Sequence, residues 1–226
     1  MLNTVILTIH NKEKSITKII HNLLNSLSKQ TSNLILILDG CKDRTEENLN
    51  EYIEFHRPKI DIQIICTNDI WETRANNVGL RNVNTEFATI VQDDMLIKHK
   101  KWDKIFIDYL KSYEIFAISG RACHEFNFEN KIFKVTNISG REYPFSNNNL
   151  FGRLVGKIVS IFKPFWIYKY LNFFSIRLVA NRGPLMMKMA IAKKLNFFDE
   201  SFAPFELDDV DLCCRAYKEF GLLSAS

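Results

Sequence analysis

The chain has 226 residues, 46% of them hydrophobic, and its 30 Lys and Arg against 26 Asp and Glu give a net charge of +4. This length and composition allow a real core, which excludes global disorder and predicts one large domain or two small ones. The mild positive charge permits anionic partners but gives no indication of nucleic-acid binding.

The cysteines and the N-terminal residues indicate the cellular compartment of the protein. The five cysteines are odd in number and lack a CxxC spacing, which argues against a disulfide framework or a zinc site and favours a reducing compartment. No basic segment followed by an apolar secretory core opens the chain, and no run of about 18 uninterrupted apolar residues occurs. We therefore expect a cytoplasmic protein.

The first half of the chain alternates predicted strands with predicted helices. Apolar runs between polar turns predict strands over Thr4 to Ile9, Leu34 to Leu38, Asp61 to Cys66, Phe87 to Val91 and Ile115 to Ser119. Helical spacing of apolar residues predicts helices after the expected caps Ser15 and Thr45, over Glu72 to Val83, and over Trp102 to Leu110.

This alternation is typical of an α/β protein with a mixed, mainly parallel sheet flanked by helices. Crossover handedness then places the ends of the first, second and fourth strands at one edge of the sheet. His10, Asp39 and the pair Asp93 and Asp94 follow those strands, so we expect them to face one crevice, where ligands of such sheets bind.

The second half is less regular. A strand is expected within Lys131 to Ile138, and Asn181-Arg-Gly-Pro184 interrupts the apolar run from Val179 to Lys188. A helix that opens at Asp208 is expected to end near Phe220, with Gly221 as its cap. Residues 150–174 mix aromatic and aliphatic residues with lysine and arginine, a composition that suits a membrane interface and equally a buried core or a dimer contact.

Two acidic pairs are the candidate chemical groups. Asp93 and Asp94 follow a buried strand, where adjacent carboxylates suit a hard divalent cation shared with a substrate phosphate. The same pair also suits an ordinary turn. Asp208 and Asp209 fall in a first helical turn, where acids also stabilise the helix dipole and cap free N–H groups.

Five segments, in this order, resemble the motifs of glycosyltransferase family 2, whose members have the GT-A fold. They are Thr8-Ile-His-Asn-Lys-Glu13, Leu38-Asp-Gly-Cys-Lys-Asp-Arg-Thr45, Thr73-Arg-Ala-Asn-Asn-Val-Gly79, Gln92-Asp-Asp94 and Leu207-Asp-Asp-Val-Asp-Leu-Cys-Cys-Arg215. The resemblance implies a single GT-A catalytic domain over residues 1–226, with a nucleotide-binding half, 1–121, and an acceptor half, 122–226.

The resemblance also implies roles for individual residues. Asp94 would bind Mn²⁺ or Mg²⁺, and Asp209 would be the general base, with Asp208 as its acidic neighbour. The nucleotide would contact Thr8, His10, Asp39, Arg74 and Asp93, and the acceptor side would include Asn181, Arg182 and Gly183.

The activity implied by the resemblance is an inverting, metal-dependent sugar transfer. The donor would be a nucleotide-sugar, a UDP-sugar by default, and the acceptor a hydroxyl of a glycan or a lipid-linked molecule. The pathway implied is the synthesis of bacterial surface polysaccharide, by an enzyme that is cytoplasmic or peripheral on the inner face of the cell membrane.

Three positions depart from the family pattern. Leu38 and Gln92 each replace an acid, and no histidine follows His124 to supply a further metal ligand. Either the donor diphosphate and water complete the metal shell, or a segment beyond Ser226 does.

Two other classes stay open. A sugar-nucleotide nucleotidyltransferase uses a similar sheet, although His10-Asn-Lys-Glu13 lacks the glycines of its phosphate loop. A module that binds nucleotide or sugar without catalysis would keep the same residues.

Overall fold

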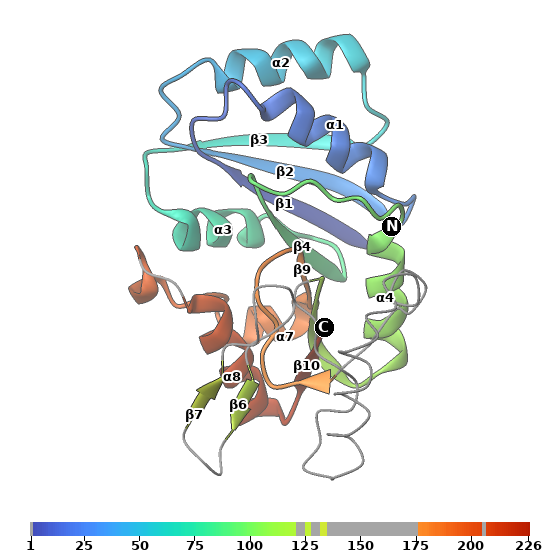
Figure 1. The fold of residues 1–226 in the computed structure, drawn as a ribbon, viewed down its shortest axis with the longest axis vertical. Helices are drawn as coiled ribbons and strands as arrows, with labels where there is room; N and C mark the ends of the chain where they lie inside the picture. The colour runs from blue at the N-terminus through green and yellow to red at the C-terminus, as the bar shows by residue number, and fades with distance from the viewer. Residues whose placement is uncertain (1, 121–124, 128–131, 135–175, 205–206) are drawn as a thin grey trace, which may run out of the picture.

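A computed structural model describes residues 2–120, 125–127, 132–134, 176–204 and 207–226 (Figure 1). Within these ranges the strands form an eight-stranded sheet in the order β3-β2-β1-β4-β9-β5-β10-β8 and a separate β6-β7 pair. The strands are β1 (Asn3–Ile9), β2 (Thr31–Asp39), β3 (Asp61–Thr67), β4 (Phe87–Gln92), β5 (Ile115–Ser119), β6 (Glu125–Asn127), β7 (Ile132–Lys134), β8 (Ile176–Arg177), β9 (Leu185–Lys188) and β10 (Leu223–Ala225).

The strands β1 to β4 are parallel, while β9 runs antiparallel between β4 and β5. The carboxyl ends of β1, β2 and β4 therefore lie at the same edge of the sheet as the amino end of β9. We call this edge the rim. The expectation that the first, second and fourth strands end at one edge is confirmed.

Helices cover both faces of the sheet (Figure 1). They are α1 (Ile16–Ser26), α2 (Thr45–His56), α3 (Glu72–Arg81), α4 (Trp102–Ser112), α7 (Met189–Lys194), the 3₁₀ turn η1 (Glu200–Phe202) and α8 (Asp208–Phe220). None of the helices in the described ranges is long and apolar enough to cross a membrane.

The two-residue period of the strands divides the core into two layers. Ile6 of β1 packs in a cluster with residues of α3, α7 and α8, whereas its neighbours Val5 and Leu7 pack in a cluster with α1, α2 and α4. All three β1 residues are fully buried. Each face of the sheet thus holds one helical layer.

Helix α3 lies unusually close to β1 because Gly79 has no side chain. A Cβ at this position would lie 2.5 Å from Cγ2 of Ile6, which is shorter than a van der Waals contact. On the same helix, the buried Asn77 exchanges two hydrogen bonds with the backbone of Phe198, at 2.9 and 3.1 Å. These two residues fix α3 against the sheet and against the segment that leads to η1.

The predicted elements of the first half and the last helix match the observed ones to within a few residues, but both expected caps need correction. Ser15 occupies the N-cap position of α1 without a side-chain capping bond. Thr45 is the first residue of α2, and Asp43 Oδ1 accepts its backbone N–H at 3.0 Å. Part of the strand expected within Lys131 to Ile138 is β7, while the rest of that range and residues 150–174 lie outside the described residues.

We predict that Gly79→Ala lowers the free energy of unfolding by about 1–2 kcal/mol. The 2.5 Å contact with Ile6 puts the cost of overpacking in the upper part of its usual range, about 2–3 kcal/mol, and alanine recovers about 1 kcal/mol of helix propensity. Chemical denaturation measures this difference. Arg81→Ala on the same helix removes only an exposed ion pair with Glu200 and should change stability by less than about 1 kcal/mol. A Gly79→Ala protein as stable as the wild type would show that α3 can move away from β1.

Candidate active site

Hydrogen bonds join residues at the carboxyl ends of β1, β2 and β4 at the rim. His10 Nδ1 lies 2.6 Å from the backbone oxygen of Asp39, and the backbone N–H of His10 donates to Asp93 Oδ2 at 3.1 Å. The structure therefore brings together three of the residues that were predicted to contact a nucleotide.

Asp39 is buried and held by one of its two carboxylate oxygens. Oδ1 accepts from the Thr67 hydroxyl at 2.7 Å and from the Ile70 backbone N–H at 2.8 Å. The other oxygen, Oδ2, makes no hydrogen bond among the described residues. An ionised carboxylate has lone pairs to spare, so Asp39 can accept a further N–H.

Asp93 and Asp94 differ in their surroundings. Asp93 pairs with Lys12, whose Nζ lies 3.2 Å from Oδ1. Asp94 is exposed, and its carboxylate takes part in none of the hydrogen bonds and ion pairs found in the described ranges.

The carboxylates at the rim limit how a divalent cation could be bound. Within the described ranges, no group of three or more His, Cys, Asp or Glu side chains is placed to hold a metal ion. One free carboxylate at a strand end instead fits a cation of the Mg²⁺ type, which is commonly bound by one or two carboxylates together with substrate phosphates and water.

Thr8 and Arg74 lie apart from these groups. The Thr8 hydroxyl donates to Asn76 Oδ1 of α3 at 2.8 Å, and both side chains are buried. Arg74 is exposed on α3. Hydrogen bonds from Asn77 and Arg81 lower the pKa of Glu200, and the charge of Arg74 makes a smaller contribution in the same direction. Among the described residues, Arg74 makes no hydrogen bond or ion pair with the other residues predicted to contact the nucleotide.

The acid pair at the start of α8 is organised by Arg182. The guanidinium Nη2 lies 3.0 Å from Asp208 Oδ1, and Nη1 lies 2.9 Å from Glu72 Oε1. The backbone N–H of the same residue donates to Asp209 Oδ2 at 2.8 Å. One residue therefore contacts both acids and also α3.

Burial and charge have opposite effects on Asp208. This side chain is fully buried, and burial raises its pKa above the ordinary value, while Arg182 and the Thr73 hydroxyl, at 2.7 Å from Oδ2, favour the charged form. Burial likewise raises the pKa of Glu72, and Arg182 again opposes the rise. We call Glu72, Arg182 and Asp208 the rim ion cluster.

The backbone of the loop before β9 fixes Arg182. Gly183 has φ 134, which glycine adopts readily and other residues rarely do. The Gly120 N–H donates to the Pro184 oxygen at 3.0 Å, and the Ser119 hydroxyl donates to the Asn181 oxygen. The end of β5 thereby holds the predicted acceptor-side residues beside Asp209.

The sequence-based assignment missed Glu72, Thr73 and Asn76, although the helical period of α3 contains the signal. Residues three and four apart share a helix face. Thr73, Asn76 and Asn77 are buried, and so face inward, whereas Arg74 and Arg81, two turns apart, lie on the exposed side.

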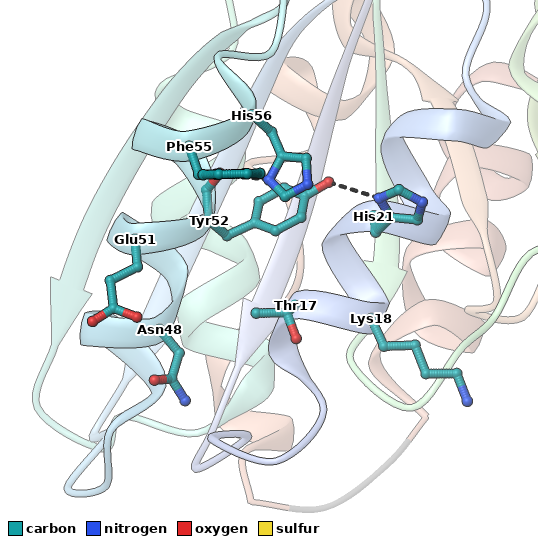
Figure 2. A pocket seen from close by; sticks show the side chains of 8 residues that line it. All are labelled: Thr17, Lys18, His21, Asn48, Glu51, Tyr52, Phe55 and His56. Atoms are coloured by element: carbon teal, nitrogen blue, oxygen red, sulfur yellow. Dashed lines mark hydrogen bonds between the residues drawn. The ribbon is translucent and has the colours of Figure 1, made fainter.

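A groove of about 610 Å³ between α1 and α2 is separate from the rim (Figure 2). Tyr52 and His56 stack in it with ring centroids 4.1 Å apart, and the Tyr52 hydroxyl lies 3.1 Å from His21 Nδ1. None of the predicted site residues lines this groove.

Comparison with known proteins bears on the family and the fold. Residues 4–170 match the family model of glycosyl transferase family 2. No curated protein matches the chain.

Solved structures with a similar fold include the mannosyltransferase PcManGT from Pyrobaculum calidifontis in complex with GDP-Man and Mn²⁺, with a TM-score of 0.61 and 14% identity over 93% of this chain and 50% of that one. S. aureus TarS in complex with UDP has a TM-score of 0.60 and 18% identity over 96% of this chain and 55% of that one. Glucosyl-3-phosphoglycerate synthase from Mycobacterium tuberculosis, in complex with Mn²⁺, UDP and phosphoglyceric acid, has a TM-score of 0.56 and 12% identity over 97% of this chain and 65% of that one. The chain therefore spans less than two thirds of the length of these structures.

We predict that Arg182→Met lowers the free energy of unfolding by about 3 kcal/mol at pH 8, chiefly because it leaves the buried carboxylate of Asp208 without a cation, while the partly exposed carboxylate of Glu72 adds less. The variant raises the folded pKa of Asp208 and Glu72 further above their ordinary values of 3.8 and 4.5. The penalty exists where these groups are charged in the folded state, so the loss should shrink as pH falls toward about 5.

Chemical denaturation of wild type and variant at both pH values measures the effect. Arg182→Lys should recover part of the stability, and the exposed Arg74→Met should cause no comparable loss. A loss that is equal at the two pH values would contradict the assignment of the penalty to Asp208 and Glu72.

Proposed function

This chain belongs to glycosyl transferase family 2 and has the GT-A fold, and we propose that it transfers a sugar from a nucleotide-sugar donor to an acceptor hydroxyl with inversion at the anomeric carbon. The observation that carries the proposal is the meeting of two sets of groups at one rim. Strand-end residues suited to a nucleotide lie on one side, and a buried, oriented carboxylate, Asp209, lies on the other.

We assign the donor to residues 1–121. Asp39 offers an unused carboxylate oxygen to a base N–H, and Thr67 and Ile70 hold that carboxylate in place. His10 lies beside Asp39, and Thr8 is bonded through its hydroxyl to Asn76 of α3. We assign Asp93 to the ribose hydroxyls. UDP is the default nucleotide. Arg74, which is exposed on α3, is assigned near the base or the diphosphate.

Asp94 is assigned as the protein ligand of a divalent cation, Mn²⁺ or Mg²⁺. A bound cation neutralises charge that develops on the departing diphosphate, acting as a Lewis acid. The exposure of Asp94 leaves room for the diphosphate and water oxygens that such a cation needs as further ligands.

Asp209 is assigned as the general base. As the acceptor oxygen attacks the anomeric carbon, the bond from that carbon to the diphosphate breaks, and the acceptor proton passes to the Asp209 carboxylate. The backbone N–H groups of Arg182 and Val210, each at 2.8 Å, fix the two carboxylate oxygens. Direct attack by the acceptor on the face opposite the diphosphate inverts the anomeric configuration without a covalent intermediate.

The acceptor is assigned to residues 122–226, with Asn181, Arg182 and Gly183 as the wall next to Asp209. A hydroxyl of a glycan or a lipid-linked molecule in surface polysaccharide synthesis is the acceptor class that we propose. The mixed aromatic and basic composition of residues 150–174 supports an enzyme at the inner surface of the membrane.

We predict that chelation abolishes transfer and that Asp94→Ala weakens binding of UDP far more than binding of uridine, because Asp94 would hold a cation that offsets the charge of the diphosphate, which uridine lacks. Calorimetry with Mn²⁺ present measures both affinities. Asp108→Ala, which removes an exposed carboxylate of α4 paired with Lys104, is the matched control and should leave both unchanged. Full activity of Asp94→Ala in metal-free buffer would overturn the metal assignment.

We predict that Asp209→Asn keeps donor binding and lowers turnover by about a hundredfold to ten-thousandfold, the usual contribution of a general base. Donor hydrolysis and transfer assays measure turnover, and a thermal melt checks that each variant is folded. If a folded Asp208→Asn loses turnover and Asp209→Asn does not, the base is the neighbouring acid. Binding of UDP without any release of sugar by the wild type would favour the non-catalytic module.

A further inference from the structure

Trp71, the N-cap residue of α3, has a backbone conformation that a tryptophan rarely adopts. Its dihedral angles are φ 73 and ψ 151. Side chains clash with the backbone in this region, which is occupied almost only by glycine, and residues held there concentrate at functional sites.

Packing of the indole does not account for this conformation. The Trp71 side chain is 52% exposed, and it takes part in none of the ring contacts found among the described residues. Trp102, by contrast, is 4% exposed and donates from Nε1 to Ser26 at 3.0 Å. Trp71 therefore combines a strained backbone with a large apolar ring that stays in contact with solvent.

The position of Trp71 links it to the donor side of the rim. Its chain neighbour Ile70 donates its N–H to Asp39 at 2.8 Å, and its other neighbour, Glu72, pairs with Arg182. The loop before Trp71 packs tightly on the turn after β2, because a Cβ on Gly40 would lie 2.6 Å from Cβ of Asp69. The backbone of Trp71 is thus fixed between the carboxylate assigned to the base and the rim ion cluster.

We propose that the Trp71 indole is a stacking surface for the nucleobase of the donor. The inference rests on the proposed function, since it requires that the rim bind a nucleotide. Every base has a π-face, so an exposed indole adds affinity for the base, while Asp39 selects its N–H groups. The contacts of Ile70 and Glu72 on either side hold the Trp71 backbone in this conformation, and the ring that it carries is exposed.

Binding measured by calorimetry tests the proposal with UDP, GDP and inorganic pyrophosphate, each with Mn²⁺ present. Trp71→Ala should bind UDP and GDP about tenfold to a hundredfold more weakly, the usual worth of stacking on one base. Pyrophosphate has no base, so its affinity should stay within about twofold. Phe55→Ala, which removes an aromatic ring that is 83% exposed in the groove between α1 and α2 (Figure 2), should change none of these affinities.

Fluorescence gives a second readout that a structural role would not produce. Saturating UDP should quench part of the tryptophan emission of the wild type, and Trp71→Phe should lose this part while it keeps UDP affinity within about tenfold. If the wild type binds UDP or GDP and a folded Trp71→Ala binds them equally well, the stacking role is wrong while the proposed function stands. If the wild type binds neither nucleotide, the proposed function fails, and the stacking role with it.

Discussion

The arrangement of the rim depends on one buried cation. Arg182 is 9% exposed and contacts Asp208 and Glu72 through its guanidinium and Asp209 through its backbone N–H. Removing a charge from water is costly, and Arg182 is stable in this position because its guanidinium is paired with two carboxylates. Since the three carboxylates come from α3 and α8, the cluster ties the donor-side helix to the helix that carries the proposed base. A change of position in either helix would break a contact of this cation.

The topology of the sheet makes this cluster possible. An antiparallel strand between two parallel ones presents its amino end where its neighbours present their carboxyl ends, and Leu185 of β9 pairs with both Ile90 and Ser119. The loop before β9 therefore reaches the rim, which a parallel strand in the same place would not allow. The Gly183 conformation and the contact of Gly120 with Pro184 then fix where Arg182 lies.

Local signals were sufficient for the elements of the first half, and long-range pairing explains what the sequence did not reveal. The strand was predicted from the apolar run Phe87 to Val91, and the last helix from the residues that follow Asp208. Both signals lie within a few neighbouring residues, so the predicted bounds were close to the observed ones. The strand β9 has four residues inside a longer apolar run, and its place between β4 and β5 depends on partners far away in the chain. Arg182 was predicted near the acceptor, but its pairing with Glu72 depends on that same placement. Arg74 was assigned from a motif, whereas the inward-facing Asn76 could have been found from the period of the helix.

The departure at Gln92 can be understood from the charges around it. Gln92 Nε2 lies 3.3 Å from Glu72 Oε1, so an acid at this position would face another carboxylate as well as Asp93. A neutral amide donates a hydrogen bond there and avoids that repulsion.

The described rim residues carry more negative than positive charge. Their carboxylates outnumber the two cations Lys12 and Arg182, and Asp94 has no cationic partner among them. A diphosphate is also an anion, and like charges that lie close together repel strongly when they are partly buried. The exposed Asp94 has room for a cation, and a cation held there, as proposed above, would offset the repulsion between the rim and a nucleoside diphosphate.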